Sequence, residues 1–419
     1  MNLSILSPLI WSLGIYWLFG EPLTRINFSI ISFSGIWTLA LLLGSVGAIF
    51  AYASLKFHVL YRFFVSTGTQ IHYWLLLVLH GILLLALSIL GDSNNNFNIT
   101  DLLSGIQQFL TWVLYGLVIF LVGVHSTLNP YFVPKLVQWL RVVFVILIPI
   151  LLTNPTRSLA SEIAVLGAAI HFLEPRSHMK WVWAFFTIFS IGLSGSRMAN
   201  VAIILALIST YLLNFRMTQP KTWRVVIFSV FVLVIFSAVF IHTPAGTRAL
   251  ALLNAGLAVF DDSPEATILT QGRSAVWPDL FHHALEQPFF GFGPGTASAY
   301  AFYLTHNERF AHPHNEYLRI FHDYGAVGLI TFIIFYVKLL FNSKLIAVQS
   351  PSPFLQRWSR AIWASTVVLL LLFMTDNVGF YVFVMTLHGA LIGIFLSHIA
   401  LLKNKKQDFE LIFNKSSLK

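Results

Sequence analysis

Long stretches of this sequence carry no charged side chain and alternate with short polar segments. Uncharged runs extend over Ile26–Leu55, Leu102–Pro134, Val225–Thr247 and Asn377–Leu402. Each is longer than the ~20 residues that an α-helix needs to cross the hydrocarbon core of a bilayer. Because a charged side chain is costly in hydrocarbon, runs of this kind predict membrane-spanning helices. The expected fold class is an all-α polytopic membrane protein.

The pattern predicts about twelve spans. Residues 180–214 are divided into two helices, because Gly192, Gly195 and the polar pair Ser196–Arg197 interrupt the apolar run. The expected spans lie near residues 4–20, 28–54, 71–90, 106–127, 131–153, 157–173, 180–195, 197–214, 223–242, 323–342, 361–376 and 379–402.

The distribution of Lys and Arg predicts the orientation, since basic residues gather in cytoplasmic loops. Basic residues recur in alternate loops and in the C-terminal tail, whereas no lysine occurs between Lys221 and Lys338. Both termini are therefore expected in the cytoplasm. The divisions are residues 1–242 with spans 1–9, an outer loop at 243–322, residues 323–402 with spans 10–12, and a basic cytoplasmic tail at 403–419.

Composition narrows the class further. The chain of 419 residues is 57% hydrophobic and 10% charged, whereas soluble domains carry about 25% charged residues. The formal net charge of +9 follows from the basic inner loops and is not interpreted as nucleic-acid binding. The absence of cysteine excludes disulfides, thiolate metal sites and a cysteine nucleophile. The first span lacks a basic residue before it and a cleavage site, so it is expected to be a retained helix.

The outer loop at 243–322 is about eighty residues long and rich in aromatic side chains, which predicts a folded cap with short helices. Segments 247–260 and 273–286 have helix-like apolar spacing. The glycine-rich segment 291–295 is expected to be a tight turn, because it lacks the strand and the lysine of a phosphate-binding loop.

Two histidines in this loop are candidate catalytic groups. His312 and His314 flank Pro313, and Asn315 is placed to cap a helix that begins at Glu316. An imidazole with an ordinary pKa near ~6.5 accepts a proton at neutral pH, so His314 is the expected general base and His312 the second choice. The alternative is a pair of interfacial histidines whose hydrogen bonds go to the backbone.

A metal site is a competing interpretation. It would combine these histidines with a second pair and nearby carboxylates, but no metal-binding motif such as HExxH is present. No metal and no cofactor are therefore expected. The further possible ligands are His282, His283, Asp261, Asp262 and Glu308.

Arginines are the candidate anion-binding groups. Arg197 stands at the outer end of a predicted span, and Arg273 at a predicted helix start, where backbone N–H groups also favour anions. The planar guanidinium suits phosphate oxygens and keeps its charge. Together with Arg248, a lesser candidate, these arginines could hold a diphosphate without a metal ion. The alternatives are an interfacial Arg197 and a solvated Arg273.

The segment His314–Asn315, nine residues and then Gly325-Ala326-Val327-Gly328 resembles the signature of the bacterial O-antigen ligase family. Arg197 after Gly195–Ser196, Arg273 after Gly272, and one large outer loop late in a chain of about twelve spans are similar to that family too. A looser form of the signature is shared with O-antigen polymerases and with protein O-oligosaccharyltransferases.

The resemblance implies a glycosyltransferase of the Gram-negative inner membrane with its active site on the periplasmic side. The donor would be a polysaccharide on undecaprenyl diphosphate, held among membrane lipids, and the acceptor a sugar hydroxyl of lipid A–core. The reaction would be inverting and independent of metal. His314, with His312 second, would remove the acceptor proton, Arg197, Arg273 and Arg248 would bind the diphosphate, and Asn315, Gly325 and Gly328 would support the site.

Two other functions are also compatible with these sequence features. An O-antigen polymerase or a protein O-oligosaccharyltransferase would use the same donor with a different acceptor. A polysaccharide or lipid transporter would also suit about twelve spans with both termini inside, but carboxylates in the spans are few, Glu162 and Asp376 being the chief ones.

Overall fold

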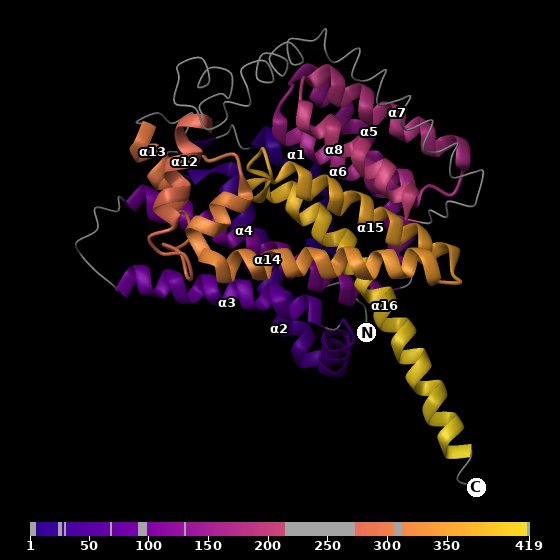
Figure 1. Ribbon diagram of the computed structural model, residues 1–419. Helices are drawn as coiled ribbons and strands as arrows, with labels where there is room; N and C mark the ends of the chain where they lie inside the picture. Colours follow the sequence, from indigo (N-terminus) through magenta and orange to yellow (C-terminus); the bar gives the residue numbers. More distant parts are fainter. Residues whose placement is uncertain are drawn as a thin grey trace.

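The computed structural model (Figure 1) describes residues 6–23, 27–28, 31–67, 69–90, 99–129, 131–213, 273–305 and 312–416. It is a bundle of long helices with two short helices at one end. The predicted span 223–242, the predicted helix 247–260 and Arg248 lie outside the described residues.

The described elements are almost all helical. A pair of two-residue antiparallel strands, β1 (Asn27–Phe28) and β2 (Ile31–Ser32), joins the first two helices. The helices are α1 (Leu6–Leu23), α2 (Phe33–Ser66), α3 (Thr69–Leu90), α4 (Ile99–Leu128), α5 (Phe132–Thr153), α6 (Arg157–Leu173), α7 (Ser177–Ser194), α8 (Arg197–Leu212), α12 (Arg273–Ala284), α13 (Thr296–Thr305), α14 (Glu316–Gln349), α15 (Pro353–Leu372), the 3₁₀ turn η4 (Val378–Phe380) and α16 (Val382–Ser416).

Among the described helices, four are long and apolar enough to cross a bilayer: Gly105–Leu128, Phe132–Thr153, Glu316–Gln349 and Val382–Leu402. A fifth candidate is the pair Gly35–Ala51 and Lys56–Val65, bent by 109° where Lys56 leaves helical geometry. The chain is thus a helical protein with several apolar spans, as expected for a multi-pass membrane protein. The number twelve stays a prediction.

The break predicted within residues 180–214 is confirmed. Helix α7 ends at Ser194, and Gly195 adopts a left-handed conformation with φ of 73°, which caps the helix. Helix α8 then starts at Arg197. The break at glycine therefore places a guanidinium at the first residue of a new helix.

Helices α4, α6 and α16 form the centre of the bundle, and nearly all of their central residues are buried. Helices α4 and α16 approach closely because glycines meet at their contact: a Cβ on Gly393 would collide with the Ile119 carbonyl oxygen. Small residues of this kind let helix backbones pack directly in membrane proteins. Among the buried polar groups of this core, His388 is paired on both sides, since it lies between the hydroxyls of Tyr115 and Thr366 at 3.0 and 3.1 Å.

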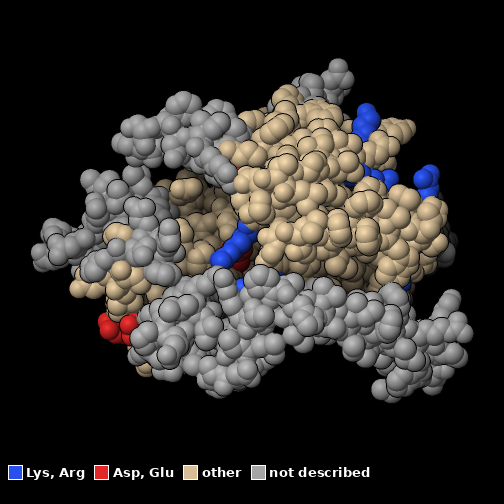
Figure 2. Space-filling view, turned by 90° about the horizontal axis from the view of Figure 1, so that it is seen from above, with Lys and Arg blue, Asp and Glu red and all other residues tan. Residues whose placement is uncertain are grey.

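The outer helices present apolar faces, and the two ends of the bundle differ in charge. Helices α12 and α13 lie together at one end, beside the start of α14, and α14 meets α15 at the other end (Figure 1). Seen from above (Figure 2), most visible Lys and Arg side chains lie toward the α14–α15 junction, and acidic atoms lie at the opposite edge. The orientation expected from the basic loops stays a prediction.

Substitution Gly393→Ala is expected to destabilise the protein, because the new methyl group must force α16 away from the α4 backbone. Overpacking of this kind typically costs about 1–3 kcal/mol. The control is Gly47→Ala on exposed α2, where an added Cβ meets no atom within 4 Å. Thermal unfolding in detergent measures the difference, and equal melting temperatures for the two variants would contradict the packing argument.

Candidate functional site

The segment His312–Asn315 packs against the turn between α15 and α16. The backbone N–H of His314 donates to Oδ1 of Asn377 at 2.9 Å, and Nδ2 of Asn377 lies 3.1 Å from Nδ1 of His314. His314 is the one described non-glycine residue with positive φ, at 52°. A side chain in this conformation is strained, and such strain is found mainly at functional sites. The Asn377 amide holds both the backbone and the ring of His314.

These two contacts define the proton position on the neutral His314 ring. Because Oδ1 of Asn377 accepts the His314 N–H, the amide nitrogen of Asn377 faces the ring and donates to Nδ1. A neutral imidazole that accepts at Nδ1 carries its proton on Nε2. In this arrangement the His314 ring presents an N–H donor, and its side chain is 25% exposed.

Asp376 is the carboxylate beside this ring. Its Oδ1 lies 3.7 Å from Nδ1 of His314 and accepts hydrogen bonds from the Tyr381 hydroxyl and the Asn377 N–H, both at 2.9 Å. The Asp376 side chain is only 7% exposed. A buried carboxylate next to an imidazole is the partner that stabilises a ring proton on Nδ1. His314, Asp376 and Asn377 therefore form one polar unit.

His312 is more deeply placed than His314. Its ring lies 4.9 Å from the Phe380 ring, and its Nδ1 is 3.4 Å from the Ser298 hydroxyl. Burial, and secondly the nearby His314 and Arg319, lower the pKa of His312 from 6.5 to about 4. A histidine with so low a pKa is neutral at pH 7 and is a weak proton acceptor.

Helix α14 begins as the sequence predicts. The Asn315 side chain accepts from the Leu318 N–H at 3.1 Å, which caps the helix, and Glu316 occupies the first turn. Asn315 thus fixes where α14 starts, one residue after His314.

Behind the cap lies a buried ion cluster that the sequence analysis did not predict. Glu316, Arg319 and Asp323 are each at most 1% exposed. The Arg319 guanidinium bonds the Glu316 carboxylate through Nε at 2.7 Å and Gln108 on α4 at 2.8 Å, and it lies 3.7 Å from Asp323. It also lies over the Phe380 ring, 5.0 Å from the centroid. Because the guanidinium is buried and paired with groups of this chain, Arg319 is not available to bind substrate.

The glycine signature has a backbone explanation. Gly325 interrupts α14 with φ of 64°, and a Cβ there would collide with the backbone of Phe289 and Phe290. Its backbone N lies against Gly291, where a Cβ would come within 2.5 Å of it. Gly328 faces Tyr324 on its own helix at similarly close range. Gly291 and Gly325 therefore let the 291–295 turn dock on α14. Positive φ at Gly291, Gly293 and Gly295 confirms the predicted turn.

Asp323 fixes that turn to the bundle. Its carboxylate accepts the backbone N–H of Gly295 at 3.0 Å and of Ala297 at 2.7 Å, and the Thr296 hydroxyl at 3.1 Å. On the same side, Nδ1 of His283 on α12 lies 2.9 Å from Nε2 of His322, so the two rings are hydrogen-bonded. The short helices of the outer loop are thus attached to α14 through side chains at its start.

Of the predicted diphosphate-binding arginines, the described residues include Arg197 and Arg273 but not Arg248. Arg273 is the first residue of α12, and Arg197 the first of α8. Helices α8 and α15 are antiparallel, because Ser209 bonds Trp363 at 3.1 Å while Tyr211, further along α8, lies near Arg360, earlier on α15. The start of α8 therefore lies at the same end of the bundle as Asp376, which follows α15.

A further arginine was missed. Arg157, at the first residue of α6, is close enough to Tyr381 to act on it electrostatically, and Tyr381 bonds Asp376. The sequence signal available for Arg157 was its place at a helix start on the predicted outer side, the same signal that selected Arg197.

Asp376 and Asn377 were also missed as site residues: Asp376 is the last residue of the predicted span 361–376, and Asn377 follows it directly. Their signal was an adjacent acid and amide in an otherwise apolar stretch. Within the described part of the chain, no group of three or more His, Asp or Glu side chains could hold a metal ion. Asp261, Asp262 and Glu308, named for the metal alternative, lie outside it.

The fold and site define a multi-helix membrane protein with a histidine–carboxylate–amide unit at the end of its bundle where α8 begins. Residues 182–333, just over a third of the chain, match the family described as O-antigen ligase. The predicted resemblance to this family is confirmed over that range, which includes Arg197, Arg273, His314 and Gly325. A search of curated proteins finds no match.

The stability of the protein is expected to fall as the pH drops from about 6.5 to about 4. The unfolded chain takes up a proton near 6.5, whereas folded His312 resists protonation until about 4. The stability that His312 contributes is complete above 6.5 and lost across this window, at most about 3 kcal/mol. His312→Gln should flatten this part of the pH dependence of thermal unfolding.

The control for this measurement is His282→Gln, which replaces an exposed histidine of α12. It should keep the pH dependence of the parent protein. If His312→Gln keeps it as well, the buried position of His312 does not resist protonation as described.

Proposed function

We propose that this protein is an O-antigen ligase, which transfers a polysaccharide from undecaprenyl diphosphate to a sugar hydroxyl of lipid A–core. The family match over residues 182–333 supports a membrane glycosyltransferase of the O-antigen ligase and polymerase superfamily. The observation that carries the proposal further is the strained, partly exposed His314, held against Asp376 and Asn377 at the end of the bundle.

In the proposed mechanism, His314 removes the proton of the acceptor hydroxyl. The ring must first move its own proton from Nε2 to Nδ1, which requires the Asn377 contact to open. The Nδ1–H then donates a hydrogen bond to the Asp376 carboxylate, which lies 3.7 Å from Nδ1 and stays ionised. Nε2 no longer carries a proton and can act as the base. Binding of the acceptor hydroxyl at Nε2 would favour this second tautomer.

The leaving group is a diphosphate, which is weakly basic and needs positive charge more than it needs an acid. Arg197 and Arg273 each stand at a helix start, where backbone N–H groups add to the positive potential. Arg157 at the start of α6 is a third cation of the same kind. Arg248 is kept from the sequence analysis as a lesser candidate.

Direct attack of the acceptor oxygen on the anomeric carbon inverts its configuration. The apolar outer faces of the helices suit the polyprenyl chain of the donor. The basic end of the bundle is assigned to the cytoplasm, so that the His314 end faces the periplasm of a Gram-negative inner membrane, with both termini inside. This assignment supports a donor presented in the outer leaflet.

Transfer by the purified full-length protein from a lipid-diphosphate glycan to lipid A–core tests the assignment of His314. His314→Ala should lower kcat by about 10²–10⁴-fold, the usual contribution of a general base, with an unchanged melting temperature. The control His282→Ala removes an exposed histidine of the same outer loop and should retain activity. Normal transfer by His314→Ala would overturn its catalytic role.

Asp376→Asn is expected to act on kcat and leave the donor KM nearly unchanged, because the carboxylate positions the ring and does not touch substrate. A loss of about 10²-fold or more is expected if Asp376 stabilises the reactive tautomer. The conservative Asp376→Glu should restore part of the rate. A change confined to KM would instead place Asp376 in substrate binding.

Parallel assays identify the acceptor. Product on lipid A–core supports the ligase, whereas elongation of unit repeats without transfer to the core would make the protein an O-antigen polymerase. Glycosylated pilin as the sole product would indicate a protein O-oligosaccharyltransferase. Loss of transfer on addition of a chelator would contradict the metal-independent mechanism.

A further inference from the structure

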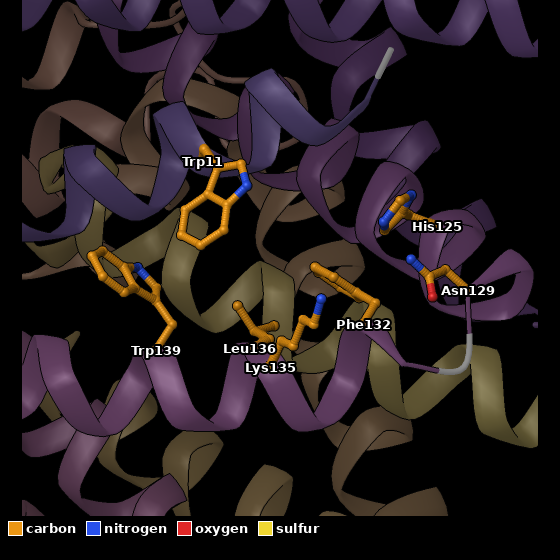
Figure 3. Close-up of a pocket in the computed structure, with 7 residues that line it drawn as sticks. All are labelled: Trp11, His125, Asn129, Phe132, Lys135, Leu136 and Trp139. Carbon is orange, nitrogen blue, oxygen red and sulfur yellow. The ribbon is translucent and has the colours of Figure 1, made fainter. Parts of the chain in front are cut away.

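A cavity lies at the other end of the bundle, between α1, α4 and α5 (Figure 3). It has a volume of about 150 Å³. His125, which lines it, is 17 residues along α4 from Gln108, the residue that bonds Arg319. At 1.5 Å per residue this is about 25 Å from the outer ion cluster, so the cavity is not part of the His314 site.

The polar groups of this cavity favour an anion. Figure 3 shows the Lys135 amine pointing between Phe132 and Leu136 toward Trp11 and His125. Lys135 stands in the first turn of α5, where backbone N–H groups contribute further positive potential. It has no carboxylate partner within the described residues, and Asn129 supplies an amide at the rim.

Two residues that line the cavity have a buried nitrogen without a hydrogen-bond partner, Nδ1 of His125 and Nε1 of Trp139. His125 is 4% exposed, and its Nδ1 has no hydrogen-bond partner. Its ring packs edge-on against the Phe132 ring, with the two centroids 4.7 Å apart. A buried polar atom without a partner is costly, and a ligand that bonds it removes that cost.

Apolar stripes lead away from the cavity along both helices. Trp11, Ile15 and Phe19 are four residues apart on α1 and each at least 40% exposed. Val142 and Val145 continue the line from Lys135 on α5 and are similarly exposed. The two helices are in contact at Trp139 of α5, whose ring packs edge-on against that of Trp11 with the centroids 5.7 Å apart. Indoles at such positions mark the interface between headgroups and acyl chains.

We propose that this cavity binds an anionic phospholipid of the leaflet opposite the His314 site. The phosphate group lies between Lys135 and His125 Nδ1, and the acyl chains lie on the stripes of α1 and α5. Inorganic phosphate could bind the same two polar groups, but it has no apolar part that would cover the exposed stripes of α1 and α5. The paired polar and apolar surfaces therefore favour the lipid.

Native mass spectrometry of the full-length, delipidated protein tests this proposal. The protein should bind phosphatidylglycerol more tightly than phosphatidylcholine. Lys135→Gln should weaken phosphatidylglycerol binding about fivefold or more, as expected for one lysine at an anionic headgroup. The control Lys344→Gln removes a second exposed lysine at the predicted cytoplasmic end and should bind as the parent protein does.

A second variant isolates the imidazole. His125→Phe keeps the ring contact with Phe132 and removes Nδ1, so it should weaken binding while the melting temperature without lipid is retained. Equal binding by the Lys135→Gln and Lys344→Gln variants would overturn the proposal. Saturation of the site by inorganic phosphate, with loss of phosphatidylglycerol binding, would replace the lipid by a free anion.

Discussion

The end of the bundle that holds His314 depends on the ion pairs of the buried Arg319 guanidinium. This guanidinium joins Glu316 and Asp323 of α14 to Gln108 of α4, and the Phe380 ring covers it. Charges removed from water are tolerated only when they are paired, and loss of one partner typically costs about 3–5 kcal/mol. The cluster therefore fixes α14, α4 and the α15–α16 turn relative to one another.

The position of His314 follows from that constraint. Glu316 is held by Arg319, and its backbone N–H bonds the Phe373 carbonyl oxygen at 2.8 Å, so the residues just before α14 must pass over the end of α15. Gly379 has no Cβ that would press on the Glu316 carboxylate. The turn that contains Asn377 can then reach both the backbone and the ring of His314. Asp323 continues the same cluster to the glycine turn of the outer loop.

Much of the framework could be predicted because local physics dictates it. The break at Gly195, the Asn315 cap, the start of α12 at Arg273 and the glycine turn at 291–295 each depend on a few neighbouring residues. The partners of His314 could not be predicted in this way. Asn377 lies 63 residues from it in the chain, and nothing local reveals that pairing. The spans were expected, but α16 continues as a helix to Ser416, past the predicted end at 402.

The sequence alone determined the membrane class, most helix positions and the family resemblance, because hydropathy, glycine and capping act over short distances. It also named His314, Arg197 and Arg273. Only the tertiary structure decided which groups surround the imidazole, where its proton sits, and that Arg319 is consumed by internal ion pairs. It also revealed Lys135 and the unpartnered His125 at one cavity. Those properties arise from side chains on separate helices, whose approach is set by packing and not by their neighbours in the chain.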